Sequence, residues 1–267
     1  MKLEIGCQLD YETTQNTPLI LMLRPRSGTG QWVTKEEYVL QPNVPVVEYT
    51  DMYGNLCQRL VTPQGNFSIK TSAVEDVHDQ IDVDFSANFV PIQELPDDSL
   101  IYLLPSRYCE ADKLGGLAYK ITKNAVTGYE QVEAIRHWIN QNILYQYNHS
   151  TASTSAQDTA ETRIGVCRDF SHLGIALCRS LSIPARFVVG YLYQLKPMDL
   201  HAWFEAYLGG RWYTFDGTQT QPMGNRVVLA YGRDAADVAL ATQFGDMQLT
   251  SMYVSVEPAK ESTEIAS

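Results

Sequence analysis

The chain has 267 residues, enough for one large domain or two smaller ones, and its hydrophobic content of 45% is sufficient for ordinary packed cores. A net charge of −11 provides no basic surface for neutralising phosphates, which argues against a nucleic-acid partner. No apolar run approaches the ~20 residues that cross a bilayer, and the first residues lack the basic and then apolar order of a secretory signal, so we expect no membrane partner.

The first part of the chain alternates polar and apolar residues with a period of two. Leu3, Ile5, Cys7 and Leu9 fall on one face, and residues 81–87 repeat the pattern. Alternation of this kind predicts strands with one buried face. Turn-forming residues separate these segments at 26–30, 51–55 and 63–66. We therefore predict a β-rich, sandwich-like N-terminal domain over residues 1–95.

Beyond a connector at residues 91–106, the hydrophobic period changes to 3.6, which predicts helices. One apolar stripe covers residues 114–121, and a second covers residues 132–143. Thr127 and Glu130 have the spacing of a capping box, in which two side chains satisfy free backbone amides. This pair predicts the start of the second helix.

A third helix is predicted after a loop rich in Ser and Thr at residues 149–162. Phe170, Leu173 and Leu177 lie on its apolar face at helical spacing. Pro184 is expected to end it, because proline cannot continue a helix.

The last part of the chain is predicted to be mostly strands. Apolar or alternating runs cover residues 185–193, 199–208, 211–215 and 249–256. Gly209-Gly210 separates two of these strands as a two-residue hairpin turn. Residues 234–242 have a weak helical pattern. These elements and the helices make up a second predicted domain over residues 96–267.

The five cysteines are an odd number and are scattered along the chain. In a chain of ordinary size this favours free thiols in a reducing compartment over a disulfide framework. We therefore expect the protein in the cytoplasm.

Cys167 lies at the start of the third predicted helix, after Gly165 and Val166. Unpaired amides and the positive end of the helix dipole stabilise a thiolate over a thiol at such a position. Arg168 adds positive charge beside it, and Asp169 is ordinary for a first helical turn. A thiolate is the nucleophile of acyl transfer, and the same amides can bind an oxyanion.

Two other residues of this helix serve as controls. Cys178 lies roughly 16 Å further along the axis, so it cannot share a metal ion or a disulfide with Cys167. His172 is rotated from Cys167 by roughly 140°, so it cannot act as the base of that thiol. We interpret Cys178 as core packing and His172 as a surface or capping residue.

The hairpin DLHAWFEAYLGGRWYTFDGT supplies a candidate base. If Gly209-Gly210 closes a two-residue turn, Leu208 pairs with Arg211. His201 and Asp216 are then diagonal neighbours on one face, with backbones roughly 7 Å apart. An odd loop length or a bulge would change this register. Taken singly, His201 is equally compatible with a structural histidine and Asp216 with a turn former.

Together the three residues supply a nucleophile, a base and a carboxylate that fixes the imidazole tautomer. The segments GVCRDFSHLGIALCRSLSIPARFVVGY and LHAWFEAYLGGRWYTFDGT resemble the core of the transglutaminase-like cysteine enzymes, in the bacterial branch with an extra β-rich N-terminal region. The Cys, His, Asp order of that family falls on Cys167, His201 and Asp216. LLPSRYCEADKL and GRDAADV are also similar to this branch.

The resemblance implies an α+β fold with a papain-like transglutaminase core, in which the cysteine helix packs against an antiparallel sheet that carries the base. The N-terminal β-sandwich-like domain precedes this core. The implied activity is that of a cysteine peptidase or amidase acting on a peptide or protein amide through a thioester. One oxyanion donor is then the Cys167 amide, and a second is expected from Tyr147 or Asn148, unless both only shape the loop.

Two other functions stay open at this point. The thioester can pass its acyl group to an amine, as in the crosslinking relatives, or the fold can persist as a non-catalytic interaction module. The presence of all three residues argues against lost activity. No compact acidic run resembles the calcium sites of the crosslinking relatives, so we expect neither a metal nor a cofactor. Trp203 and Glu205 share the face of His201 and line a substrate cleft or belong to the sheet surface.

Overall fold

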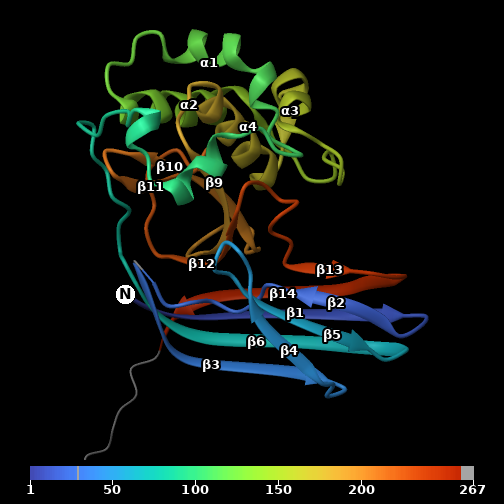
Figure 1. Ribbon diagram of the computed structural model, residues 1–267. Helices are drawn as coiled ribbons and strands as arrows, with labels where there is room; N and C mark the ends of the chain where they lie inside the picture. The colour runs from blue at the N-terminus through green and yellow to red at the C-terminus, as the bar shows by residue number, and fades with distance from the viewer. Residues whose placement is uncertain (29, 260–267) are drawn as a thin grey trace, which may run out of the picture.

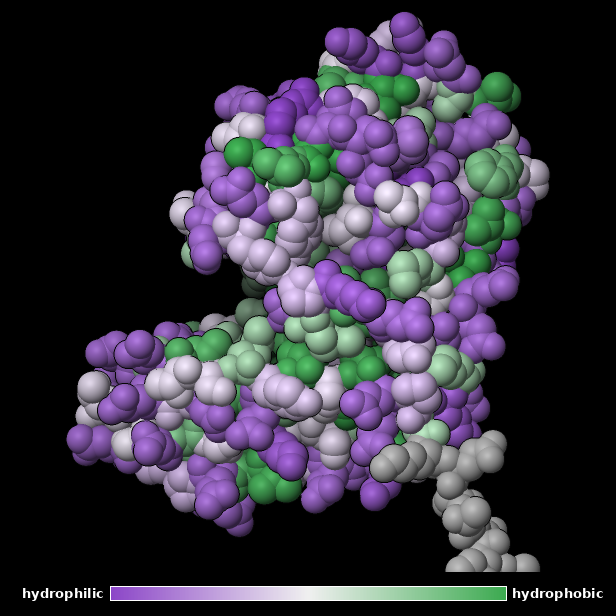
Figure 2. Space-filling view, turned by 180° about the vertical axis from the view of Figure 1, so that it is seen from behind, coloured by the Kyte–Doolittle hydropathy of each residue, from purple (hydrophilic) through white to green (hydrophobic). Residues whose placement is uncertain are grey.

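The computed structural model describes residues 1–28 and 30–259, which form two lobes (Figure 1). The strand lobe contains β1–β6, β13 and β14, and the helical lobe contains α1–α4 and β7–β12. Seen from behind, the lobes meet along a waist with a notch on one side (Figure 2). This mixed α+β architecture is the fold class that the sequence predicts.

The strand lobe consists of two antiparallel sheets of four strands, in the orders β14-β1-β6-β3 and β13-β2-β5-β4. Its strands are β1 (Lys2–Thr13), β2 (Thr17–Leu21), β3 (Gln31–Gln41), β4 (Val46–Thr50), β5 (Leu56–Thr62), β6 (Gly65–Val77), β13 (Ala241–Gln243) and β14 (Met247–Pro258). Every second residue of β1 is buried, which confirms the period-two prediction for this strand.

The final two strands join the sheets formed by the start of the chain. β14 pairs with β1 and β13 pairs with β2, both antiparallel. Residues 241–258 thus lie with the strand lobe, although the predicted second domain runs over residues 96–267. The alternation of side chains identifies a strand but not its partner, so a division made in chain order does not anticipate this return.

Two elements predicted from the sequence are absent from the described residues. Residues 81–87 form irregular structure with one turn in place of a strand, and Phe85 leaves 56% of its surface exposed. The predicted helix at residues 234–242 is also wrong. The Asp234 carboxylate accepts the backbone N–H groups of Tyr108 and Ala236, both at 2.8 Å, so the side chain closes a turn that competes with a helix.

The helical lobe packs its helices on a central antiparallel sheet in the order β11-β10-β9-β12. Its elements are α1 (Gly115–Thr122), α2 (Gly128–Asn142), β7 (Leu144–Tyr145), α3 (Ala156–Thr162), β8 (Ile164–Gly165), α4 (Cys167–Ser180), β9 (Ala185–Leu192), β10 (His201–Leu208), β11 (Arg211–Phe215) and β12 (Arg226–Gly232). Three short 3-10 helices precede them, η1 (Ile92–Glu94), η2 (Asp97–Leu103) and η3 (Ala111–Lys113). Within the described residues, no helix is both long and apolar enough to cross a bilayer.

Helix α4 lies directly on β10 because Gly174 removes the side chain that would separate them. A Cβ atom at Gly174 would overlap the ring of Phe204. The start of α2 has the predicted capping box, with Thr127 Oγ1 accepting from the Glu130 amide at 3.2 Å and Glu130 Oε2 accepting from the Thr127 amide at 3.1 Å. Close packing on β10 fixes where the first residue of α4 lies relative to the sheet.

Two amide side chains of the strand lobe bind the backbone of β12. Gln31 accepts from the Val228 amide at 2.6 Å and donates to the Val228 carbonyl at 2.9 Å. Asn55 does the same at Tyr231, at 2.8 Å and 2.7 Å. Because both amides are buried, these four bonds satisfy the free edge of the central sheet and hold the lobes together.

Candidate active site

Cys167 is the first residue of α4 and is half-buried, whereas the other four cysteines are buried. The Asp169 carboxylate accepts the Val166 amide at 2.9 Å and also bonds the Ser150 hydroxyl. It therefore satisfies the amide that precedes Cys167 and holds the neighbouring loop against the helix start. The thiol lies where backbone amides and the helix dipole favour an anion.

Arg168 does not direct its charge toward the thiol in the way that the sequence suggests. Its guanidinium forms an ion pair with Asp169 at 3.0 Å and donates to the Thr151 carbonyl at 2.6 Å. The buried carboxylate needs this partner, since an unpaired buried charge is costly. Arg168 thus stabilises the turn that carries Cys167.

His201 is the first residue of β10 and lies beside the loop that follows β11. The hairpin has the predicted register, with Leu208 opposite Arg211, and its two glycines have φ values of 55° and 91°. His201 Nε2 lies 2.8 Å from Asp216 Oδ2, with the pair buried. Binding at Nε2 leaves Nδ1 as the nitrogen that can face a thiol.

The charge state of His201 is set by competing effects. Burial alone would lower the pKa of His201, but the charge and hydrogen bond of Asp216 outweigh it, and Cys167 adds in the same direction, so that the pKa rises to about 9. The influence of Cys167 on this pKa indicates that its thiol lies near the ring. The structure thus brings His201 and Asp216 into direct contact, with Cys167 near enough to influence the ring, and the raised pKa favours an imidazolium at neutral pH.

Asp216 is buried, yet both of its oxygens are bound. Oδ2 accepts from His201 and from Arg226 Nη2 at 2.9 Å, and Oδ1 accepts from the Thr218 amide at 3.0 Å and the Thr218 hydroxyl at 2.7 Å. Burial opposes ionisation, but the charges of His201 and Arg226 and these bonds hold the pKa of Asp216 well below its usual range. The carboxylate therefore stays ionised. Sequence reasoning missed Arg226, whose position depends on β12 pairing with β9.

Of the predictions for the two control residues of α4, one is confirmed and one is wrong. Cys178 is buried, and burial raises the pKa of its thiol, which confirms its role in core packing. The prediction that His172 is a surface or capping residue is wrong. His172 is buried, stacks on Tyr108 at 5.1 Å and accepts the Ala235 amide at 3.1 Å. The helical pattern could not reveal this, because Tyr108 and Ala235 come from distant segments.

Tyr145 is a residue near the thiol that the sequence did not indicate. β7 and β8 pair in parallel, so Tyr145 lies opposite Gly165, two residues before Cys167. Burial raises the pKa of Tyr145, and the charge of Cys167 and the hydroxyl of Tyr147 act in the same direction, while the Cys167 amide opposes them through a hydrogen bond. The Tyr145 hydroxyl therefore shares its surroundings with the amide at the start of α4. No local pattern predicts this two-residue parallel pair.

A cavity of about 290 Å³ opens beside His201. It is lined by Tyr145, Tyr147, Leu195, Lys196, Pro197, Asp199, Leu200, His201, Thr218 and Gln219. A wider hollow of about 760 Å³ adjoins it and shares Lys196 and Gln219. Tyr147 is thus in the wall, whereas Asn148 is exposed outside it. Whether either donates to an oxyanion stays a prediction.

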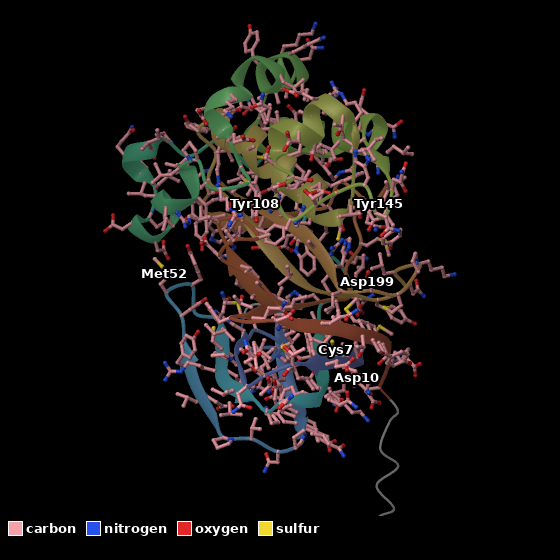
Figure 3. All side chains as sticks on the ribbon, turned by 90° about the vertical axis from the view of Figure 1, so that its right-hand side faces the viewer. Cys7, Asp10, Met52, Tyr108, Tyr145 and Asp199 are labelled. Atoms are coloured by element: carbon pink, nitrogen blue, oxygen red, sulfur yellow. The ribbon has the colours of Figure 1, made fainter. Side chains whose placement is uncertain are left out.

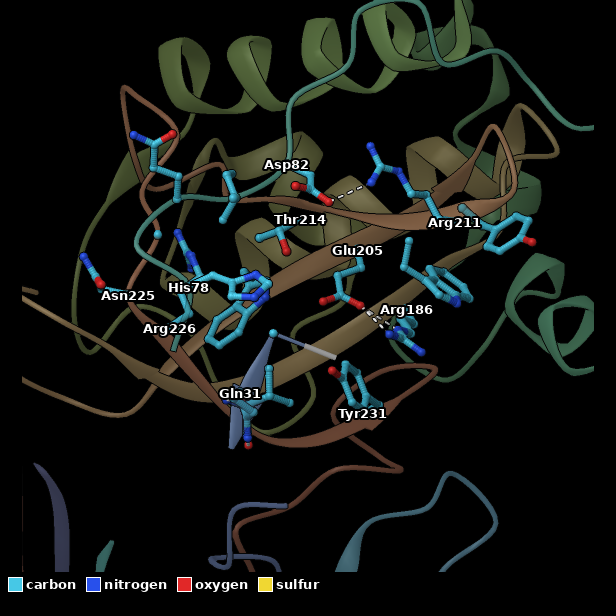
Figure 4. Close-up of a pocket in the computed structure, with 18 of the residues that line it drawn as sticks. Gln31, His78, Asp82, Arg186, Glu205, Arg211, Thr214, Asn225, Arg226 and Tyr231 are labelled. Carbon is cyan, nitrogen blue, oxygen red and sulfur yellow. Dashed lines mark hydrogen bonds and ion pairs between the residues drawn. The ribbon is translucent and has the colours of Figure 1, made fainter. Parts of the chain in front are cut away.

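Trp203 and Glu205 line a separate cavity of about 460 Å³ on the face of the sheet away from α4 (Figure 4). Glu205 pairs there with Arg186 at 2.6 Å, and the Arg186 guanidinium lies over the rings of Trp212 and Tyr231. The sheet-surface alternative for Trp203 and Glu205 is therefore incorrect, because both are buried, and their role in a substrate cleft stays a prediction. They neither line the cavity at His201 nor lie on an exposed sheet surface.

Over residues 1–28 and 30–259, no group of three or more His, Cys, Asp or Glu side chains is arranged to hold a metal ion.

Comparison with known proteins places these features in a family. A model of the transglutaminase-like superfamily matches residues 115–217, a range that includes Cys167, His201 and Asp216. The solved structure of a "Putative Cysteine Protease" from Cytophaga hutchinsonii is 39% identical, with a TM-score of 0.92 over 97% of this chain and 91% of that chain. An uncharacterized protein of Mycobacterium leprae is 27% identical over 234 residues, 81% of this chain and 82% of its own length. One from Mycobacterium tuberculosis is 33% identical over 115 residues, 38% of this chain and 37% of its own.

Proposed function

The chain belongs to the transglutaminase-like superfamily, and from that premise we propose that it is a cysteine peptidase or amidase with Cys167 as nucleophile, His201 as base and Asp216 as orienting carboxylate. The observation that carries the proposal is the buried contact of 2.8 Å between His201 Nε2 and Asp216 Oδ2. Cys167 also contributes to the raised pKa of the same imidazole ring. Such a contact fixes one tautomer and one ring orientation.

In the proposed first step, the Cys167 thiolate attacks an amide carbonyl carbon, and the C=O electron pair moves to oxygen. The proposal pairs the Cys167 thiolate with a His201 imidazolium, the form of the ring that its raised pKa of about 9 favours. Collapse of the oxyanion expels the amine, which takes its proton from His201. A thioester at Cys167 and a neutral imidazole remain.

In the proposed second step, His201 takes a proton from water as the water oxygen attacks the thioester carbon. The C–S bond then breaks, the acid is released, and the thiolate and imidazolium are restored. An amine in place of water would give a new amide. We propose hydrolysis as the main outcome, because the cavity beside His201 opens onto a wide hollow that admits water.

The backbone amide of Cys167 is the proposed first oxyanion donor. The hydroxyls of Tyr145 and Tyr147 are candidates for the second, because both tyrosines line the cavity and Tyr145 pairs opposite Gly165, two residues before Cys167. A tyrosine hydroxyl carries one proton and can therefore donate to an oxyanion.

We further propose that the substrate is a peptide or protein amide, that neither nucleic acid nor a membrane is a partner, and that the protein works in the cytoplasm. All five cysteines are free, which suits a reducing compartment. The net charge of −11 gives no general attraction for anionic polymers or lipids.

The proposal is tested by incubating the protein with a mixed peptide pool in water enriched in oxygen-18, with and without a primary alkylamine. With wild type we expect new peptide C-termini that carry one heavy oxygen atom, and with Cys167→Ser we expect no new C-termini. Cys178→Ser is the matched control and should keep activity. Amine capture at the same peptides would identify acyl transfer as the main reaction. Cleavage that persists in Cys167→Ser would contradict the proposal.

A further inference from the structure

The loop between β9 and β10 brings an acidic side chain into the wall of the cavity at His201. Asp199 lies two residues before His201, and both line the same cavity as Tyr145. Its Oδ1 accepts the Leu200 amide at 2.7 Å. The loop therefore places the Asp199 carboxylate near the imidazole, and this carboxylate lacks a full set of hydrogen-bond partners.

The Asp199 carboxylate is partly buried and forms no ion pair within the described part of the chain. Burial raises the pKa of Asp199, although the Leu200 amide and the charge of His201 oppose this. The negative charge of Asp199 also contributes to the raised pKa of Cys7 in β1, which lies below it in Figure 3. A half-desolvated carboxylate without a counter-ion is stabilised by a cation that enters the cavity.

The remaining wall suits a cation as well. Tyr145 and Tyr147 lie with ring centroids 5.4 Å apart in an edge-to-face arrangement, and both line the cavity. Aromatic faces attract ammonium and guanidinium groups. Lys196 is the opposing charge in this wall, but it is exposed and lies where the cavity joins the wider hollow. Its field is therefore more strongly screened than that of Asp199.

The position of Asp199 indicates which half of a substrate it meets. In the proposed mechanism, His201 exchanges a proton with the amine that leaves, so this amine must come within hydrogen-bond reach of the ring. Asp199 lies on the same wall as the ring. We propose that this cavity receives the amine half of the substrate and that Asp199 selects a positively charged group there, an alkylammonium or a guanidinium next to the scissile bond. The inference rests on the proposed function.

The test needs no knowledge of the natural substrate. Three chloroacetamides are compared, with N-substituents that differ in charge: 2-(trimethylammonio)ethyl, its neutral carbon analogue 3,3-dimethylbutyl, and 2-carboxyethyl. Each alkylates a thiolate by forming an S–CH2 bond as chloride leaves with the bonding electrons. Rates at Cys167 are measured by peptide mass spectrometry and divided by the rates with glutathione.

We expect the cationic probe to label wild-type Cys167 about tenfold faster than the neutral analogue after this correction, and the anionic probe to be slowest. Asp199→Asn should bring the ratio of cationic to neutral rates near one. Asp97→Asn, the control, makes the same charge change at an exposed position at the start of η2 and should keep the wild-type ratio. If Asp199→Asn does not fold, Lys196→Gln still tests the inference, since it should increase the ratio.

Two results would overturn the inference, and they have different meanings. In the first, Cys167 is labelled rapidly, but wild type shows no preference for the cationic probe or Asp199→Asn retains that preference. This result removes the role of Asp199 and leaves the proposed enzyme intact. A Cys167 that reacts with none of the probes in folded protein removes both the enzyme and the cation site.

Discussion

The helical lobe contains two buried histidines in opposite charge states. His201 on β10 is 3% exposed and contacts Asp216, and its pKa is raised to about 9. His172 in α4 is fully buried against Tyr108, and burial, with the charges of nearby arginines, holds its pKa well below the ordinary value. Equal burial thus gives opposite outcomes. A buried carboxylate, and not depth in the core, makes one histidine a base for the thiol.

The largest effect is expected from exchanging each histidine for glutamine. His201→Gln should lower turnover by roughly 10²–10⁴-fold, because the general base is lost. His172→Gln should keep turnover per folded molecule while lowering the free energy of unfolding by about 1–3 kcal/mol, since a buried hydrogen bond is disturbed. Turnover of a peptide pool and urea unfolding measure the two quantities. Equal losses of turnover in both variants would contradict the assignment of a catalytic role to His201 and a structural role to His172.

Asp216→Asn should give His201 surroundings like those of His172. Without the carboxylate, burial dominates and the pKa of His201 should fall below its ordinary value of 6.5. Turnover at neutral pH should drop about 10²-fold, and the buried Arg226, left without its anion, should cost about 3–5 kcal/mol of stability. NMR titration of the imidazole carbon-bound protons measures the first effect. A His201 still protonated at pH 8 in the folded variant would contradict the role assigned to Asp216.

The two histidines should also act on stability in opposite pH windows. Because the folded pKa of His201 is raised, its contribution is full below the unfolded pKa of 6.5 and is lost as pH rises through about 9, a change of about 3 kcal/mol. The pKa of His172 is lowered, so its contribution is present above pH 6.5 and declines as pH falls below it, because only the unfolded state takes up the proton.

Urea unfolding across pH 5–9 separates these two contributions. His201→Gln should flatten the decline above pH 6.5, and His172→Gln should flatten the decline below it. An unchanged alkaline slope in His201→Gln would contradict the raised pKa.

The smallest effect is expected at Arg226, whose side chain is 6% exposed and shares Asp216 Oδ2 with His201. Arg226→Met keeps much of the volume over Trp203 but removes the competing donor and the neighbouring positive charge. The pKa of His201 should rise further, and turnover should change by less than about tenfold. The alkaline limb of the pH profile for turnover is the readout. A purely structural role would leave that limb in place.

The parts that the sequence predicted best are those fixed by neighbours in the chain. The capping box at Thr127 and the register around Gly209-Gly210 follow from short-range rules, and the structure has both. That register predicts that His201 and Asp216 are neighbours, and their contact of 2.8 Å confirms it.

The parts that the sequence did not reveal depend on distant segments. Tyr145 reaches Cys167 through a parallel pair of two residues, and Arg226 reaches Asp216 only because β12 lies beside β9. β14 pairs with the first strand of the chain. Periodicity reports which face of an element is buried but not which element covers it, so these contacts had no local signal.

Selective alkylation is the most direct test of the central claim that Cys167 is a thiolate held by His201. Folded wild-type protein is treated briefly with iodoacetamide near pH 6, and the modification of each of the five cysteines is read by mass spectrometry, with His201→Gln in parallel. The account predicts modification of Cys167 well before the other four and a marked decrease in the variant. A silent Cys167, or equal labelling of all five cysteines in folded protein, would contradict it.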